Sequence, residues 1–195
     1  MADAELPNVA ELEEMKEDDF TRAVALVTAF FAVILAITSL GGNNAGKEMM
    51  LSQQQASNQW AYYQAKVIRE HIYKTEKMTT EVALAERGAA MTVEARGNYE
   101  ALVKKLGEEA ERYSVEKKDV EKQAKELEAA RDLNMKKDPY FDFAEVLLQI
   151  AIVMASISIL AHSRQVFYLS VVMASIGAFL SFNGFTLMFA VPFLS

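Results

Sequence analysis

Cysteine is absent from this chain of 195 residues. Its absence excludes disulfide bonds, thiolate nucleophiles and metal sites built on cysteine. Histidine is scarce too, because the two residues present, His71 and His162, fall in different segments of the chain. No nucleophile–base set and no ligand cluster emerges from this inventory. The sequence therefore predicts a protein that is not an enzyme, with no cofactor and no metal site.

A basic patch is also lacking. Residues 1–40 carry eight acidic and two basic side chains, whereas residues 41–139 carry seventeen of each sign. The net charge of −7 therefore comes mainly from the N-terminal segment. Because nucleic-acid binding relies on clustered lysine and arginine side chains, this distribution argues against a nucleic-acid partner.

Proline occurs only three times, at Pro7, Pro139 and Pro192. Since proline interrupts helix interiors, the long stretch between the first two permits very long helices. The sequence NVAE that begins at Asn8 has the spacing of a capping box, and the Asp-Pro pair at Pro139 resembles a cap followed by proline in a first turn. We therefore expect a helix to begin at each of these two places.

Three long runs without Asp, Glu, Lys or Arg stand out, at residues 23–40, 146–162 and 166–195. Each is near or above the roughly 18 apolar residues that a membrane-spanning helix needs. They predict transmembrane helices at 22–41, 140–162 and 167–191, with a short loop at 163–166. The acidic segment 1–21 lacks the positive leader of a cleavable signal peptide, so we expect a helical tail before an uncleaved signal anchor.

The charged middle segment, residues 42–139, is rich in helix formers and shows no alternating strand pattern. Both of its ends must return to the same membrane face, so the chain has to reverse. Local helix breakers place the turn within 88–98 and predict an antiparallel hairpin with arms of about 40 residues, roughly 60 Å long. A coiled-coil-type seam is expected on the second arm. Its members are Tyr99, Leu106, Tyr113, Val120 and Leu127, flanked by Leu102, Ala110 and Ala124.

The single tryptophan stands in this charged segment, within the sequence QWAYYQAKVIRE at residues 59–70. Trp60 and Tyr63 share a helical face, and packing of this face against the returning arm is the simplest interpretation. An alternative is a contact site for another subunit or a protein partner, because Trp, Tyr and Arg are favoured at interfaces. A third is a kink at residues 41–44 that lays the helix on the lipid surface. The candidate interaction residues are Trp60, Tyr62, Tyr63, Gln64, Lys66 and Arg69.

The segment GGNNAGKE at residues 41–48 has the G-x4-G-K spacing of a phosphate-binding loop. The residue after the lysine is Glu48, whose carboxylate would repel phosphate and cannot replace the hydroxyl that binds Mg²⁺. The segment also follows a predicted membrane helix and not a strand. We interpret it as a flexible exit from the first membrane helix.

Four polar side chains in or near the predicted membrane helices are candidate intramembrane sites: Glu145, Gln149, Ser156 and Asn183. The first three share a helical face, and buried ionisable groups in membranes are candidates for an ion or proton path. Hydrogen bonding between helices is the interpretation that we favour for Gln149 and Asn183. Small residues four apart, such as Ala151 and Ala155, would allow the close approach that these bonds need.

The sequences ITSLGGNNAGKEMM and QWAYYQAKVIREH, the charged helical middle and the two C-terminal apolar runs resemble a family of bacterial membrane proteins known as domain-of-unknown-function family 4337. The resemblance covers nearly the whole chain. Its most specific part is the W-x-Y-Y-Q-A-K run that begins at Trp60. The resemblance implies a bacterial inner-membrane setting and brings no reaction, substrate or catalytic residue.

These features together predict an all-α membrane protein with three transmembrane helices and a long extramembrane hairpin between the first and second. We expect a non-enzymatic scaffold that forms homo-oligomers in the lipid bilayer and presents the hairpin to a protein partner. The alternative is a small ion channel or transporter subunit. Because short loops determine orientation more than long domains do, the basic 163–166 loop favours a cytoplasmic N-terminus and a periplasmic hairpin.

Overall fold

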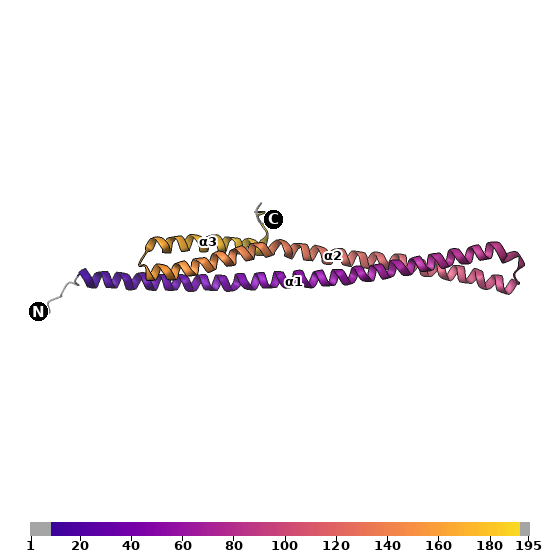
Figure 1. The fold of residues 1–195 in the computed structure, drawn as a ribbon, viewed down its shortest axis with the longest axis horizontal. Coiled ribbons are helices and arrows are strands. Elements are labelled where there is room, and N and C mark those ends of the chain that lie inside the picture. The colour runs from indigo at the N-terminus through magenta and orange to yellow at the C-terminus, as the bar shows by residue number, and fades with distance from the viewer. Residues whose placement is uncertain (1–8, 192–195) are drawn as a thin grey trace. The chain divides into compact units, whose positions relative to one another are not determined.

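The computed structural model describes the backbone of residues 9–191 and the side chains of residues 19–191. Within this range the chain forms helices and no strands: α1 (Val9–Arg87), the 3-10 helix η1 (Gly88–Ala90), α2 (Val93–Leu160) and α3 (Arg164–Thr186) (Figure 1). The prediction of an all-α chain is confirmed. The predicted cap at Asn8 lies outside the described residues, and the acidic side chains before residue 19 lie outside the described side chains.

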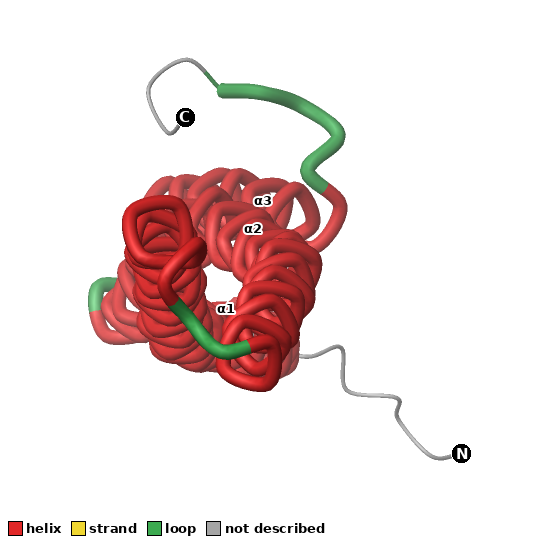
Figure 2. Tube along the Cα trace, turned by 90° about the vertical axis from the view of Figure 1, so that its right-hand side faces the viewer, coloured by secondary structure: helices red, strands yellow, loops and turns green. Residues whose placement is uncertain are grey.

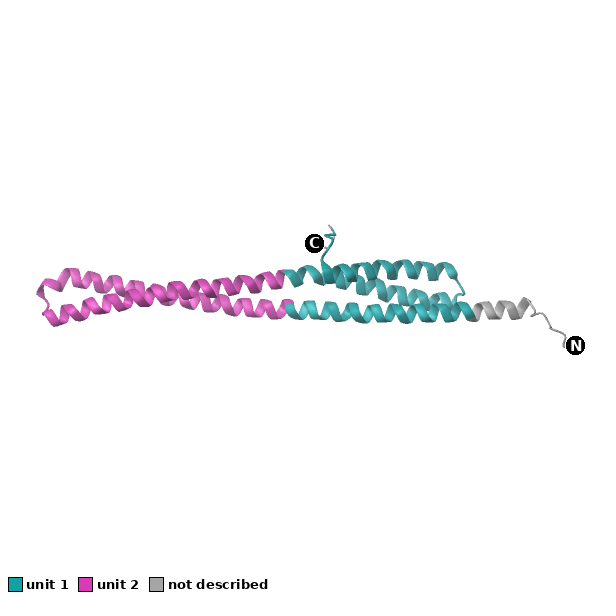
Figure 3. Ribbon diagram, turned by 180° about the vertical axis from the view of Figure 1, so that it is seen from behind, with its two compact units in different colours: residues 1–48, 133–195 teal, residues 49–132 magenta. Residues whose placement is uncertain are grey.

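The chain divides into two compact units (Figure 3). Unit 1 comprises residues 1–48 and 133–195, and unit 2 comprises residues 49–132. α1 and α2 contribute to both units, whereas α3 belongs to unit 1 alone. The three apolar runs of the sequence therefore fall in unit 1, and most of the charged middle segment falls in unit 2.

In unit 2, α1 and α2 run antiparallel. Trp60 of α1 hydrogen-bonds to Glu128 of α2. Lys77, further along α1, lies against Gly107, which is nearer the start of α2. Residue numbers thus rise along one helix as they fall along the other, and the two helices form a hairpin.

The chain reverses at residues 88–92, between the end of α1 and the start of α2 (Figure 2). The amide of Met91 bonds to the carbonyl of Gly88 at 3.4 Å and closes the short 3-10 turn. The hydroxyl of Thr92 then accepts a hydrogen bond from the amide of Ala95 at 3.3 Å. This bond caps the first turn of α2, where backbone amides have no intrahelical acceptor.

Unit 1 packs parts of all three helices around small and apolar side chains. Its core cluster joins Phe31 of α1, Leu148 and Ala151 of α2, and Ala174 of α3. Gly177 lets α3 approach α2 closely, because a Cβ at this position would lie 3.0 Å from the Leu148 side chain. Close contact through small residues is typical of helices that pack together in membranes.

The predicted flexible exit and the alternative kink at residues 41–44 are wrong, because α1 continues through this stretch without a break. The glycines have a packing role instead. A Cβ on Gly41 would lie 2.7 Å from ring carbons of both Phe141 and Phe185, and one on Gly42 would lie 3.1 Å from Phe141. The missing side chains admit the Phe141 ring, which meets Phe185 edge-on with ring centroids 4.8 Å apart.

A second correction concerns Pro139, which lies inside α2 and does not begin a helix. Proline has no amide hydrogen to bond to the carbonyl four residues before it, so the helix loses one backbone hydrogen bond here. The residues that follow are firmly packed: Tyr140 is 3% exposed and Phe141 is 2% exposed. This burial holds the helix continuous across a residue that would favour a break in isolation.

The third apolar helix is shorter than the predicted 167–191, because α3 stops at Thr186. The chain then turns back towards Asn183, whose side chain is fully buried. The Asn183 amide nitrogen donates to the carbonyl of Phe189 at 2.8 Å, and its oxygen accepts from the amide of Phe189 at 2.9 Å. These two bonds satisfy backbone groups that follow the helix end.

Each of the three α-helices contains a stretch long and apolar enough to cross a membrane, judged by length and composition. In unit 1 many large apolar side chains point outward. Leu26, Val153 and Val172, one on each helix, are 74%, 57% and 52% exposed. Unit 1 therefore carries apolar side chains on its surface as well as in its core.

Candidate functional site

Trp60 is half-buried in unit 2 and contacts the returning helix. Its Nε1 donates a hydrogen bond to the Glu128 carboxylate at 2.9 Å, and its ring meets Tyr63 edge-on with centroids 5.5 Å apart. Lys66 also reaches α2, where it forms an ion pair with Glu116. The more exposed members of the predicted interaction set are Tyr62, Gln64 and Arg69. Of these three, Arg69 still reaches α2, where it donates a hydrogen bond to Tyr113. Trp60, Lys66 and Arg69 therefore join the two helices.

A continuous seam joins the helices of unit 2. On α1, every position reached from Ser52 to Leu84 by alternating steps of four and three residues is buried or half-buried. On α2, the same is true of the positions reached from Val103 to Arg131 by alternating steps of three and four residues. This spacing keeps one side of each helix against its neighbour. The predicted seam member Tyr99 and the flanking residue Leu102 are exposed. Leu102 lines a shallow surface hollow with the short side chains of Thr75, Thr79 and Thr80 of α1.

The seam contains a buried carboxylate, Glu70, whose side chain is 3% exposed. It pairs with Lys117 of α2 and with Lys74 of α1, both at 2.6 Å. Lys117 first, and then Lys74, lower the pKa of Glu70, while Glu70 raises the pKa of Lys117. Because Lys117 comes from the opposite helix, a shift along the seam would remove this partner and leave the buried carboxylate with Lys74 alone. Glu70 therefore favours one register of the two helices.

Tyr113 lies one turn before Lys117 and is packed among cations and a second tyrosine. Its hydroxyl accepts a hydrogen bond from Arg69 at 3.2 Å, and its ring stacks on Tyr73 with centroids 5.6 Å apart and an interplanar angle of 13°. Arg69 and Arg112 lower the pKa of Tyr113 by hydrogen bonding to it. These contacts join aromatic and charged side chains of both helices into one layer, which we call the charged layer and which also contains Glu70.

The charged layer can hold two helices in register, but it offers no access to a substrate. Glu70 is 3% exposed and Tyr113 is 6% exposed. Across the part of the chain whose side chains are described, no group of three His, Cys, Asp or Glu residues could hold a metal ion. The pKa of Glu70 is thus lowered by its lysine partners, and the pKa of Tyr113 is lowered by hydrogen bonds from arginine.

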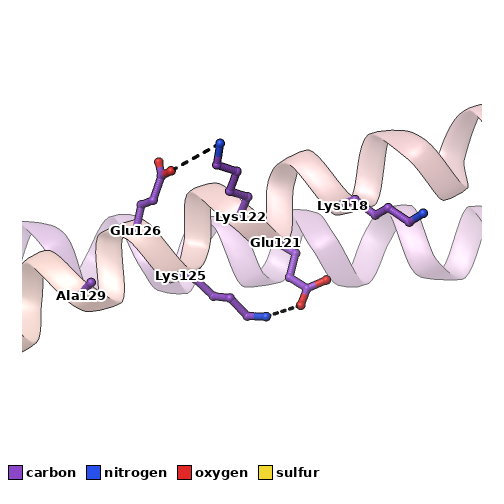
Figure 4. Close-up of a pocket in the computed structure, with 6 residues that line it drawn as sticks. All are labelled: Lys118, Glu121, Lys122, Lys125, Glu126 and Ala129. Atoms are coloured by element: carbon purple, nitrogen blue, oxygen red, sulfur yellow. Dashed lines mark hydrogen bonds and ion pairs between the residues drawn. The ribbon is translucent and has the colours of Figure 1, made fainter.

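The outer face of α2 in unit 2 carries charges in regular pairs (Figure 4). Lys125 pairs with Glu121 at 2.6 Å, and Lys122 lies 3.9 Å from Glu126. These residues line a shallow surface hollow together with Lys118 and Ala129. All six belong to one helix, and exposed pairs of this kind contribute little free energy. We interpret this face as solvated surface.

A different face of α1 carries apolar side chains that the sequence reasoning missed. Ile68 and Ile72 are 59% and 49% exposed, and they line a shallow hollow with His71, Thr75 and Glu76. The signal in the sequence was a pair of isoleucines four residues apart, outside the seam, in an otherwise polar segment. We call this surface the Ile68–Ile72 face.

Three of the predicted intramembrane polar residues make local bonds along α2. The Gln149 amide donates to the Glu145 carboxylate at 3.2 Å. The Ser156 hydroxyl donates to the carbonyl of Ile152 at 3.0 Å. Both Gln149 and Ser156 are exposed, so this polar face of α2 is turned outward from unit 1.

The fourth, Asn183, bonds to the segment after α3 and not to a neighbouring helix. The hydrogen bond between helices comes instead from Thr38 of α1 and Ser181 of α3, whose hydroxyl oxygens lie 2.8 Å apart and are buried. Two small hydroxyls carry no distinctive sequence signal, because Ser and Thr in apolar helices usually bond to their own backbone. Only the helix contacts identify this pair.

Comparison with known proteins adds one match. The model of a family described as a domain of unknown function (DUF4337) matches residues 20–187. No curated protein and no solved structure matches the chain. The matched range takes in nearly all of the described residues and includes parts of both units.

Proposed function

The chain belongs to the family described as a domain of unknown function (DUF4337), and from this premise we propose that it is a membrane-embedded scaffold. Unit 1 lies in the lipid bilayer, and unit 2 is a water-facing helical hairpin that presents a docking surface to a protein partner. The chain catalyses no reaction. The observation that carries this proposal is the contrast between the apolar surface of unit 1 and the charged surface of unit 2.

The apolar surface of unit 1 suits lipid. Soluble proteins rarely expose large contiguous apolar patches, whereas lipid-facing helices require them. Large apolar side chains of unit 1 that are more than half exposed include Leu26, Phe30, Val33, Ile37, Val146, Val153, Val172 and Phe179. The buried hydroxyls of Thr38 and Ser181 bond to each other, as polar groups inside a membrane helix bundle need to do.

The surface of unit 2 suits water, because ion pairs such as Lys125–Glu121 cover the outer face of its second helix. The charged layer fixes the register of its two helices, so side chains on the outside are presented at defined positions. The Ile68–Ile72 face is the docking surface that we propose, since exposed apolar side chains on a charged background mark interaction sites. Crosslinking in native membranes should capture a partner that Ile68→Ser with Ile72→Ser loses, while the charge-face control Lys122→Gln retains it.

The membrane that we propose is a bacterial inner membrane, in which the chain forms homo-oligomers through its transmembrane helices. The N-terminus lies in the cytoplasm and the hairpin in the periplasm. The basic residue Arg164, which begins α3 directly after the short connection from α2, favours this orientation.

Orientation can be tested with single cysteines, because the native chain has none. Gly97 is a suitable site, since a Cβ there meets nothing within 4 Å, and Ser163 marks the loop between α2 and α3. In intact cells an impermeant thiol reagent should label Gly97→Cys and spare Ser163→Cys, and carbonate should not extract the protein from membranes. Labelling at 163 alone would reverse the orientation, labelling at both would contradict three spans, and extraction would contradict the membrane location.

A second function, a channel or transporter subunit, has one observation in its favour. Asp142, Gln149 and Ser156 are exposed, and with the half-buried Glu145 they follow one face of α2. If several copies brought these faces together, a polar path would cross the membrane. Ion flux in proteoliposomes that depends on Glu145 and is lost in Glu145→Gln would favour this function, whereas the scaffold requires no flux.

A further inference from the structure

Unit 1 contains a cavity of about 200 Å³ beside the end of α3. α3 stops at Thr186. α1 and α2 continue past this point, and their residues Glu48 and Asn134 line the cavity. The cavity is therefore the space left where a third helix ends and two others continue. All of its lining residues belong to unit 1.

The cavity has an apolar floor. Phe141 and Phe185 both line it, and their rings meet edge-on with centroids 4.8 Å apart. A Cβ on Gly184 would lie 3.0 Å from the Phe141 ring. The floor is thus held by close packing of rings against glycine backbone and is suited to aliphatic carbons.

Two opposite charges line the cavity. Lys137 is half-buried and Glu48 is exposed, and no ion pair joins them to each other or to any other residue whose side chain is described. The amide side chains of Asn44 and Asn134 complete the polar part of the lining. One ammonium and one carboxylate in the same small cavity complement a ligand that carries one charge of each sign. A ligand with a phosphate and no cationic group would be repelled by the Glu48 carboxylate.

The position and size of the cavity restrict that ligand further. Glu48 lies just after the first uncharged run of the sequence and Lys137 lies just before the second, so under the proposed function the cavity is at the bilayer surface. Its volume of about 200 Å³ is below the roughly 300–1,000 Å³ of pockets for drug-sized ligands. It can admit a headgroup, while attached acyl chains remain in the bilayer.

We propose that this cavity binds the headgroup of a zwitterionic phospholipid with a primary ammonium group, the chemistry of a phosphatidylethanolamine. Lys137 takes the phosphate, Glu48 accepts hydrogen bonds from the ammonium, and Phe185, which is 50% exposed and is held in place by the buried Phe141, contacts the glycerol carbons. A primary ammonium donates hydrogen bonds to a carboxylate, whereas the trimethylammonium of phosphatidylcholine has no hydrogen to donate. The inference rests on the proposed function to the extent that unit 1 must lie in a bilayer.

Native mass spectrometry of the full-length protein in detergent tests the site. Titration with phosphatidylethanolamine should give one saturable adduct, with phosphatidylcholine and phosphatidylglycerol bound more weakly. Lys137→Gln and Glu48→Gln should each weaken the adduct about tenfold, the effect of one charge-assisted hydrogen bond. Lys136→Gln is the matched control, because Lys136 is the adjacent residue, carries the same charge and does not line the cavity. Unchanged helical circular dichroism confirms that each variant is folded.

Equal binding of phosphatidylethanolamine and phosphatidylglycerol would overturn the inference, and so would an equal loss in Lys136→Gln and Lys137→Gln. Carbonate extraction separates this failure from that of the proposed function. A protein that stays in the membrane without a preference for the ethanolamine headgroup contradicts the headgroup site alone. A protein that carbonate releases contradicts the membrane location on which both rest.

Discussion

At the scale of single residues, Glu70 is the side chain on which the register of the hairpin most depends. It is buried, and its two partners come from both helices of unit 2. Glu70→Gln keeps the shape of the side chain and removes the charge, which leaves Lys117 without its carboxylate. Because Lys117 and Lys74 are 25% and 57% exposed and can turn to water, we expect a loss of about 1–3 kcal/mol in the free energy of opening. Hydrogen exchange at amides of residues 49–132 measures it.

Glu126→Gln is the matched control for this prediction. Glu126 carries the same charge on the same unit, but its side chain is 66% exposed and lies 3.9 Å from Lys122. Its removal should change the opening free energy by less than about 0.5 kcal/mol. If both variants lost protection to the same extent, the burial of Glu70 would not matter, and the register would depend on apolar contacts alone.

At the scale of helices, the sequence predicted the elements better than their ends. Uncharged runs identify helices that can span a membrane because the signal is summed over many residues. Two of the errors arose from local helix-breaking residues. Pro139 is a local breaker that packing overrides, and the glycines at residues 41–44 favour a flexible segment until the rings of Phe141 and Phe185 are known to fill the space beside them. The helix propensity of residues 41–44 does not predict this packing, since those rings come from other helices.

The sites divide in the same way. Seven-residue spacing predicted that Leu106, Tyr113 and Val120 would share a face, and all three are buried. The link from Trp60 to Glu128 was expected only as packing, because the register of the two arms cannot be read from one sequence. The cavity beside α3 could not be predicted at all. It exists because α3 stops at Thr186, and the helix end is set by the bonds of Asn183 to the segment that follows.

At the scale of the whole molecule, carboxyl groups within unit 2 and a carboxyl group within unit 1 have pKa values shifted in opposite directions. In unit 2, lysines lower the pKa of Glu70 and Glu116 below the ordinary value of 4.5. A carboxylate whose pKa is lower in the folded state than in the unfolded state stabilises the fold at pH values above its unfolded-state pKa. This stabilisation is lost as the pH falls through the folded-state pKa. In unit 1, burial and then the nearby Asp142 raise the pKa of Asp138 above its ordinary value of 3.8. This shift has the opposite sign, because protonation relieves an unfavourable charge.

We therefore expect acid to act on the two units in opposite directions. As pH falls from about 5 to about 3, opening of unit 2 should become easier, because Glu70 and Glu116 must be protonated and their pairs with lysine are lost. Protection near Asp138 should be maintained or should rise. Hydrogen exchange of the full-length protein in detergent, corrected for intrinsic rates at each pH, resolves the units by peptide. In Glu70→Gln the acid response of unit 2 should shrink, since one of the two carboxylates responsible is gone. Parallel loss of protection in both units would mean that acid acts through net charge and not through these side chains.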